Sequence, residues 1–178
     1  FSSDVKFFER YLQNAPPFLP LPAQKTRPAR QTFKGHSIQK WLDAPLVNAV
    51  EKVSAMHDVS SFMVFMANFG YWLCSLTRFR DLVAGTMSAA RNSADDLHAV
   101  GFFSDSLPVR FVVPEDVTFG EWLLTVKENL LEVSEHQSVP FEWLLRKLNP
   151  PRDLSYHPVF QVMLVHQRSE KETPRFDG

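Results

Sequence analysis

The hydrophobic positions of this chain predict helices in five stretches. In these stretches apolar residues recur every three or four positions, the spacing that gathers them on one face of a helix. Ser60 or Ser61 can cap one helix and Thr118 another, and Pro140 suits a first turn, where its missing N–H is not needed. The predicted helices are residues 4–13, 44–57, from 60 or 61 to about 77, a long helix after 118, and 140–149.

Apolar and β-branched runs between the helices predict strands. Residues 82–85 suit a buried strand, 32–42 an edge strand with moderate alternation, 102–113 a long strand and 159–166 a final strand. Five prolines within residues 16–30 predict an extended surface connector, because proline lacks an N–H donor and fixes φ. Helices interleaved with strands predict an α/β sandwich.

Composition narrows the classes of partner. A chain of 178 residues, 44% hydrophobic and 22% charged, fits one ordered globular domain. Its net charge of -1 provides no basic surplus for a phosphate backbone, so we expect no nucleic acid partner. The longest apolar stretch, residues 62–76, contains Asn68 and Gly70 and is shorter than the roughly 20 residues that span a bilayer. We therefore expect a core helix there and no membrane partner.

Cysteine and histidine positions predict neither a disulfide nor a metal site. Cys74 is the only cysteine, which excludes an internal disulfide and fits a reducing, cytoplasmic location. Its apolar neighbours predict a buried, inert thiol. His36, His98, His157 and His166 have no partner at metal-ligand spacing, so we expect no zinc site.

Three late segments carry a specific pattern. Residues 100–110 are V-G-F-F-S-D-S-L-P-V-R, 136–142 are H-Q-S-V-P-F-E, and 152–163 are R-D-L-S-Y-H-P-V-F-Q-V-M. In order and spacing they resemble the I-G-F-F-V-N-T-L-P-L-R, H-Q-D-x-P-F-E and R-D-x-S-x-x-P-L-F-Q-V-M motifs of condensation domains from non-ribosomal peptide synthetases. Residues 11–22 also resemble the family's Y-L-x-G-A-P-P-x-L-x-L-P, so the resemblance covers nearly the whole chain.

The resemblance implies a chloramphenicol acetyltransferase-like fold, in which two lobes form a V and each is a sheet backed by helices. The family's catalytic H-H-x-x-x-D-G motif precedes these segments and is absent from this sequence. We therefore expect residues 1–178 to be the C-terminal lobe, with a helix and proline-rich connector over 1–30 and an α/β core over 31–178. A lobe without its N-terminal partner should expose an apolar face.

The resemblance also implies a function. The intact domain would transfer an acyl or peptidyl group from one carrier protein to the amine of an aminoacyl thioester on another, forming an amide. This lobe would supply half of the tunnel and be inactive alone. The implied partners are the N-terminal lobe, donor and acceptor carrier proteins and an adjacent adenylation domain. No cofactor is expected to be bound covalently, and the carriers' phosphopantetheine arms would be the tunnel ligands.

Five residues are the site candidates that the resemblance implies. Asp105 takes the place of the family's usual asparagine in a strand facing the tunnel; the alternative is that it points to solvent. Ser104 and Ser106 flank it, where the family has an apolar residue and threonine. Arg91 ends a stretch like G-T-P-V-A-G-R and is a candidate to tie down the other lobe's catalytic loop, unless it is a surface arginine. His136 is a candidate, but a helix end also favours a histidine there.

The remaining motif residues are expected to shape the lobe, and Arg110 could equally be a structural ion-pair partner. Three alternatives stay open: a non-catalytic platform that recruits another protein, an ester-forming, epimerising or cyclising relative, and an unrelated α/β interaction domain. H-Q-x-x-P-F-E favours ordinary condensation over epimerisation. The motif residues are Gly101, Phe102, Arg110, Gln137, Pro140, Phe141, Glu142, Arg152, Asp153, Phe160 and Gln161.

Overall fold

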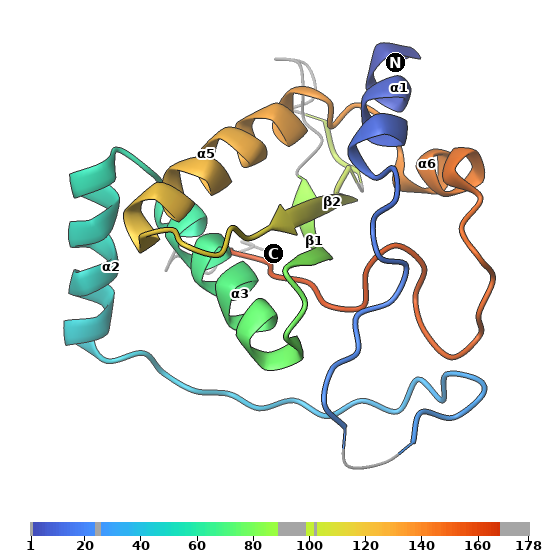
Figure 1. Ribbon diagram of the computed structural model, residues 1–178, viewed down its shortest axis with the longest axis horizontal. Helices are drawn as coiled ribbons and strands as arrows, with labels where there is room; N and C mark the ends of the chain where they lie inside the picture. The colour runs from blue at the N-terminus through green and yellow to red at the C-terminus, as the bar shows by residue number, and fades with distance from the viewer. Residues whose placement is uncertain (1, 24–25, 89–98, 102, 168–178) are drawn as a thin grey trace, which may run out of the picture.

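The computed structural model describes residues 2–23, 26–88, 99–101 and 103–167. A central pair of strands packs between two groups of helices, so the predicted α/β class is confirmed (Figure 1). Helices α3 and α5 contact each other and the strands on one side, while α1 and α6 contact each other at the opposite end. The elements are α1 (Ser2–Tyr11), α2 (Ala44–His57), α3 (Ser61–Thr77), β1 (Asp81–Ser88), β2 (Asp105–Val112), α5 (Phe119–Glu135) and α6 (Phe141–Leu148).

The helices begin where the sequence supplies capping groups. The Ser60 hydroxyl accepts the Met63 N–H at the start of α3. Thr118 and Glu121 form a reciprocal capping box at the start of α5. Asp43 caps α2, which the sequence analysis did not anticipate. Thus the predicted helices are all present, with boundaries close to those expected.

Strands β1 and β2 are antiparallel, from Asp81 opposite Val112 to Ser88 opposite Asp105. The predicted strand over 159–166 is wrong, because only Met163 forms an isolated parallel bridge, to Gly85. Val159 has a φ of 71°, which bends the backbone away from an extended conformation just before this bridge. Strand β2 is also shorter than residues 102–113, since it begins at Asp105.

The core lies between the strands and helices α3 and α5. Phe111 of β2 packs against Gly70 of α3, where an added Cβ would lie 2.9 Å from the phenyl ring. The indole N–H of Trp122 donates to the Ala67 carbonyl at 2.9 Å, which joins α5 to α3. Cys74 is buried, and burial raises the pKa of its thiol to about 11, which agrees with an inert thiol.

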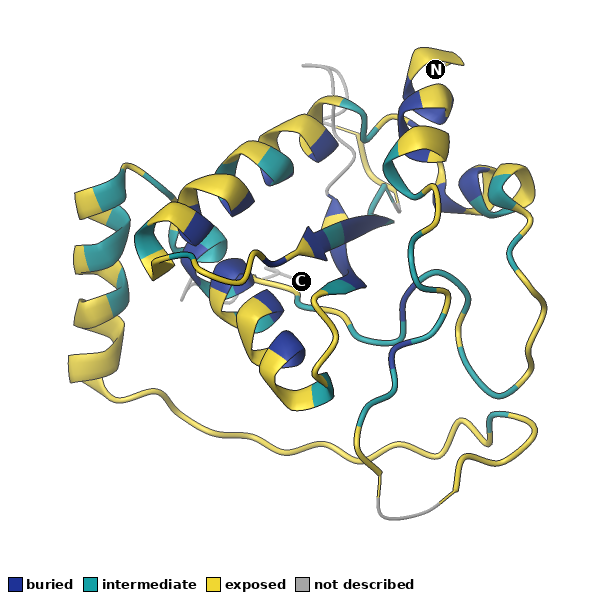
Figure 2. Cartoon of the chain, in the orientation of Figure 1, coloured by how far each residue is buried: buried dark blue, intermediate teal, exposed yellow. Residues whose placement is uncertain are grey.

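The segment before α2 differs most from the prediction. Residues 32–42 form no strand and are exposed along their whole length. Helix α2 forms as predicted but buries no residue completely, and it lies at the edge of the molecule (Figure 2). In the proline-rich connector, Leu19 is buried rather than on the surface. The exposed apolar side chains therefore include a group on residues 33–56.

Among the described residues, no single helix is long and apolar enough to cross a membrane. Helices α2 and α3 reach that length and composition only as a pair, and they are bent by 102° at the break between them.

Candidate functional site

Asp105 lies at the start of β2, directly before the N-terminus of α6 in space. One carboxylate oxygen accepts the Phe141 N–H at 2.8 Å, and the other accepts the Ser106 N–H at 2.7 Å. The first turn of a helix has unsatisfied N–H groups, and the Asp105 side chain accepts one of them. Asp105 therefore caps α6, while its proposed place along a tunnel remains a prediction.

Gln137 connects the end of α5 to the end of β1. Its side-chain oxygen accepts a hydrogen bond from the Ser88 hydroxyl, and its amide nitrogen lies 3.4 Å from the Ser134 hydroxyl. Ser88 is buried and is paired in the sheet with Asp105. The H-Q motif thus fixes the loop between α5 and α6 against β1, the strand that pairs with the one carrying Asp105.

His136 is the C-terminal cap residue of α5 and contacts α1. Its Nδ1 lies 2.9 Å from a carboxylate oxygen of Asp4, and its ring stacks on Phe7 with the centroids 4.1 Å apart. The second Asp4 oxygen accepts a hydrogen bond from Ser138. These contacts give His136 a structural role in the described chain, as its position at a helix end also suggested.

Asp4 is buried and was not singled out from the sequence. The hydrogen bond from Ser138, then the one from His136, lower the pKa of this carboxyl well below its usual value of 3.8, although burial opposes the shift. A signal was available, because Asp4 precedes Phe7 and Phe8 by three and four positions and so shares the apolar face of α1. An acid on an apolar face needs a partner.

We call this group the α5–α6 junction: Asp4, Ser88, Asp105, His136, Gln137 and Ser138. It brings together two predicted site residues, Asp105 and His136, with Ser106 beside them. Ser104 is half-buried and makes no hydrogen bond to the described residues. Arg91 and Phe102 lie outside the described residues.

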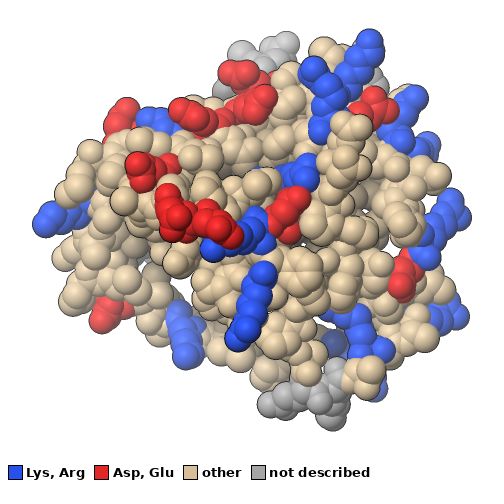
Figure 3. Space-filling model, viewed as in Figure 1, with Lys and Arg blue, Asp and Glu red and all other residues tan. Residues whose placement is uncertain are grey.

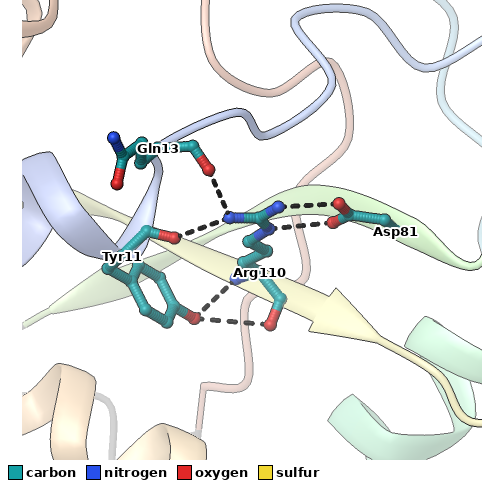
Figure 4. A network of polar contacts seen from close by, with 4 residues as sticks. All are labelled: Tyr11, Gln13, Asp81 and Arg110. Atoms are coloured by element: carbon teal, nitrogen blue, oxygen red, sulfur yellow. Dashed lines mark hydrogen bonds and ion pairs between the residues drawn. The ribbon is translucent and has the colours of Figure 1, made fainter.

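Arg110 forms a second network, in which it pairs with Asp81 (Figure 4). Its guanidinium binds both carboxylate oxygens of Asp81, at 2.9 and 2.7 Å, and donates to the carbonyls of Tyr11 and Gln13 at 3.0 and 2.9 Å. This side-chain contact with Asp81 raises the pKa of Arg110 further. Arg110 therefore ties both strands to the end of α1.

Tyr11 and Asn129 close the outer edge of β2. The Arg110 N–H donates to the Tyr11 hydroxyl at 2.7 Å, and the Asn129 amide donates to the Arg110 carbonyl at 2.9 Å. Burial raises the pKa of Tyr11 to about 12, so the phenol stays neutral. Pro108, two residues before Arg110, presents no N–H on the same edge.

The late R-D-x-S motif and the residues after it are largely structural. Gln161 accepts the Leu19 N–H at 2.7 Å and donates to the His157 carbonyl at 2.8 Å, which fixes the proline-rich connector. The Asp153 carboxylate accepts the Ser155 N–H at 2.7 Å. Phe141 and Phe160 are buried, whereas the remaining described motif residues outside the networks above are exposed: Gly101, Pro140, Glu142 and Arg152.

One hollow is lined by none of the junction residues. Its volume is about 860 Å³, and it is lined by α2, by the turn into α3 and by residues 164–166; Val50, Ser54, Phe65 and His166 are among the lining residues. No predicted site residue lines it. Within the described ranges, no group of three or more histidines, cysteines, aspartates and glutamates could hold a metal ion.

Charged side chains divide the surface into regions. On the face shown in Figure 3, carboxylates gather over α5, whereas lysines and arginines gather over α1 and α6. Helix α5 carries Glu121, Glu128, Glu132 and Glu135, and α6 ends with Arg146 and Lys147. This face is therefore negatively charged over α5 and positively charged over α1 and α6.

Known proteins with similar sequences are peptide synthetases. The chain is 37% identical over 156 residues to surfactin synthase subunit 2 of Bacillus subtilis, which covers 88% of the chain and 4% of that protein. It is 33% identical over 176 residues to malpinin synthetase of Mortierella alpina, covering 99% of the chain and 2% of the synthetase. The chain thus spans only a few per cent of these proteins.

Solved structures with the same fold include condensation domains. The X-domain from teicoplanin biosynthesis has a TM-score of 0.84 and 28% identity, covering 91% of this chain and 36% of that one. The condensation domain of the monacolin K polyketide synthase has a TM-score of 0.81 and 25% identity, covering 91% and 40%. A four-domain non-ribosomal peptide synthetase has a TM-score of 0.91 at 23% identity, covering 94% and 13%, which shows the fold alone.

The sequence also matches the condensation-domain family over residues 1–177. This match excludes an unrelated α/β interaction domain. The order of the three late motifs, the α/β fold and the two sets of relatives agree with one another, and the chain belongs to the condensation-domain family.

Proposed function

We propose that this chain is the C-terminal lobe of a condensation domain that forms amide bonds between carrier-bound thioesters. The observation that carries the proposal is the family match over residues 1–177 in a sequence without H-H-x-x-x-D-G. Related domains are longer, since the chain covers 36% of the teicoplanin X-domain structure and 40% of the monacolin K condensation-domain structure. The histidine motif would then belong to the remaining part of the domain.

The contacts at the α5–α6 junction favour a structural role for His136 and Asp105 rather than a catalytic one. His136 is held by Asp4 and Phe7, and Asp105 is held by the N-terminus of α6. A general base has to reach the proton it removes, and neither group is directed by these contacts toward a substrate. The base would be a histidine of the other lobe, whose usual pKa lies near neutral pH.

In this proposal the lobe contributes one wall of the tunnel and helps to position two tethered reactants. Alignment of the two reactants lowers the barrier by removing the entropy of bringing them together. The partners would be the N-terminal lobe, the donor and acceptor carrier proteins with their phosphopantetheine arms, and an adjacent adenylation domain. The protein would act in the reducing cytoplasm, with no cofactor bound covalently.

The test is amide formation from loaded carrier proteins, followed by mass spectrometry of the carriers. A polypeptide that includes the preceding H-H-x-x-x-D-G lobe should form product, and a His→Ala change at the second histidine of that motif should abolish it. The 178-residue chain should form none. Product from the 178-residue chain alone, or product that survives the histidine change, would overturn the proposal.

A second candidate is a non-catalytic platform that recruits another protein. It is favoured by the likeness to the teicoplanin X-domain, which has also been solved as a complex with OxyB at 28% identity and a TM-score of 0.83 to this chain. The discriminating observation is the sequence upstream of this lobe. The platform would be favoured by three results together: both motif histidines are absent upstream, no amide product forms, and a separate protein binds in a stoichiometric complex.

A further inference from the structure

The two carboxylate oxygens of Asp4 hold the residues on either side of Gln137, where the loop between α5 and α6 passes beside α1 (Figure 1). One oxygen lies 2.9 Å from Nδ1 of His136, and the other accepts a hydrogen bond from the Ser138 hydroxyl. The His136 ring also stacks on Phe7, on the same face of α1 as Asp4. Helix α1 therefore fixes the side chains that flank Gln137.

The Gln137 side chain makes its own contacts with α5 and β1. Its oxygen accepts a hydrogen bond from the hydroxyl of buried Ser88, and its amide nitrogen lies 3.4 Å from the Ser134 hydroxyl. Ser88 is the last residue of β1 and is paired with Asp105, the first residue of β2. The position of Gln137 relative to the strand ends therefore depends on how Asp4 holds its two neighbours.

A buried carboxylate is an expensive way to attach a helix. Asp4 is 8% exposed and lies on the apolar face of α1, with Phe7 and Phe8. Because charges lose their hydration on burial, a well-packed apolar side chain often stabilises a fold as well as a buried polar pair does. What the carboxylate adds is direction, since its two acceptor oxygens specify which way His136 and Ser138 face.

We propose that Asp4 is a positioning residue for the condensation reaction: it orients the loop between α5 and α6 so that Gln137 holds the end of β1 beside Asp105. This inference rests on the proposed function. The site candidates Asp105 and Ser106 begin β2, so a shift of the strand ends would displace them. Asp4 would touch neither substrate and would act through alignment, on which the rate depends steeply.

Steady-state kinetics of a polypeptide that contains both lobes test this role, at a temperature at which every variant is folded. Asp4→Asn should lower kcat for amide formation about tenfold and change KM for the loaded carriers by less than about twofold. Glu9→Gln is the matched control, because it removes a carboxylate from an exposed position of the same helix, and its kcat should stay within about twofold of the parent. A parental kcat in Asp4→Asn would overturn the inference.

A double-mutant cycle separates positioning from a general loss of structure. Gln137→Ala should itself lower kcat about tenfold, and Asp4→Asn should lower it no further in the Gln137→Ala background. If Asp4→Asn lowers kcat by the same factor in both backgrounds, Asp4 does not act through Gln137 and the inference is rejected.

A spectroscopic readout reports the orientation of Gln137 without any catalysis. In the NMR spectrum of the 178-residue chain, Asp4→Asn should shift the side-chain NH₂ resonances of Gln137. Those of Gln161 should stay in place, because its amide nitrogen contacts the carbonyls of Pro17 and His157, far from Asp4 in sequence and outside the junction. Unchanged Gln137 resonances, or equal shifts of both glutamines, would contradict the inference.

The inference and the proposed function fail in different ways. No amide product from the parent two-lobe polypeptide would reject the proposed function and, with it, a role for Asp4 in the reaction. Product from the parent, together with a parental kcat in Asp4→Asn, would reject the inference alone.

Discussion

Gly85 of β1 and Phe160 are in such close contact that a side chain on Gly85 would overlap the aromatic ring. An added Cβ would lie 2.5 Å from Cε2 of Phe160 and 2.8 Å from two further ring atoms. Phe160 is itself buried against Phe141, with ring centroids 5.3 Å apart. The glycine of the G-T-M-S-A-A-R stretch and the phenylalanine of the last motif are thus two halves of one contact.

Gly85→Ala should lower the free energy of unfolding by about 1–3 kcal/mol, because the ring or the strand has to move. Chemical denaturation measures the change. Gly35→Ala is the matched control, since nothing lies within 4 Å of its added Cβ, and it should stay within about 0.5 kcal/mol of the parent. A double-mutant cycle tests the cause. If Gly85→Ala lowers the free energy of unfolding as much in a Phe160→Ala background as in the parent, overlap with the Phe160 ring is not the reason for the loss.

Arg110→Ala should destabilise the chain by about 2–4 kcal/mol, because it leaves the Asp81 carboxylate and the carbonyls of Tyr11 and Gln13 without their donor. The Arg110 side chain is 17% exposed and that of Asp81 is 35% exposed, so solvent screens the pair only in part. Arg152→Ala, at an exposed motif arginine, should change the free energy of unfolding by less than about 0.5 kcal/mol. Equal effects of the two changes would reject the network as the anchor of α1.

Asp4 should make the lobe sensitive to acid. Its pKa is lowered in the folded chain, so its contribution to stability is fully present above the unfolded value of about 3.8 and is lost as the pH falls below it. Asp4→Asn should lower the free energy of unfolding by about 1–3 kcal/mol at pH 7. The variant should also lose less stability than the parent as the pH falls below about 4. Denaturation curves at several pH values measure the free energy of unfolding as a function of pH. If this pH dependence were the same in Asp4→Asn as in the parent, Asp4 would not be the acid-sensitive group.

Asp105→Asn restores the residue that the family usually has at this position. The carboxylate accepts two N–H groups with two oxygens, whereas an asparagine side chain has one acceptor oxygen and would direct its NH₂ toward the other N–H. Stability should fall by about 0.5–1.5 kcal/mol, and Asp105→Ala should have a larger effect. Thermal unfolding measures both variants, and a stabilised Asp105→Asn would show that α6 does not need the charge.

Local signals were sufficient for the helices but located only two of the four predicted strands, β1 and β2. Ser60, Thr118 and the prolines after Asn149 define helix ends through groups within a few residues, which the sequence displays directly. A strand requires a partner, and neither residues 32–42 nor residues 159–166 find a full one in the described chain. The strands that the pattern predicted at residues 32–42 and 159–166 are therefore wrong for the described chain.

The candidate site was predicted in part for the same reason. Asp105 and His136 were found through their motifs, but their partners are distant in sequence. Asp105 bonds to the N-terminus of α6, 36 positions away, and His136 bonds to Asp4, 132 positions away. Contacts at such separations depend on packing, not on spacing. The bidentate Arg110–Asp81 pair was anticipated only as an unspecified ion pair, because its second residue has no motif of its own.

The closed edges of the sheet bear on how copies of this lobe behave at high concentration. An open strand edge is a template on which identical chains can add one after another, and Pro108, Tyr11 and Asn129 remove that template from β2. The β1 edge is covered by the chain segment around Met163. Addition of a further strand to the core sheet is therefore opposed at Gly85 on one edge and at Arg110 on the other.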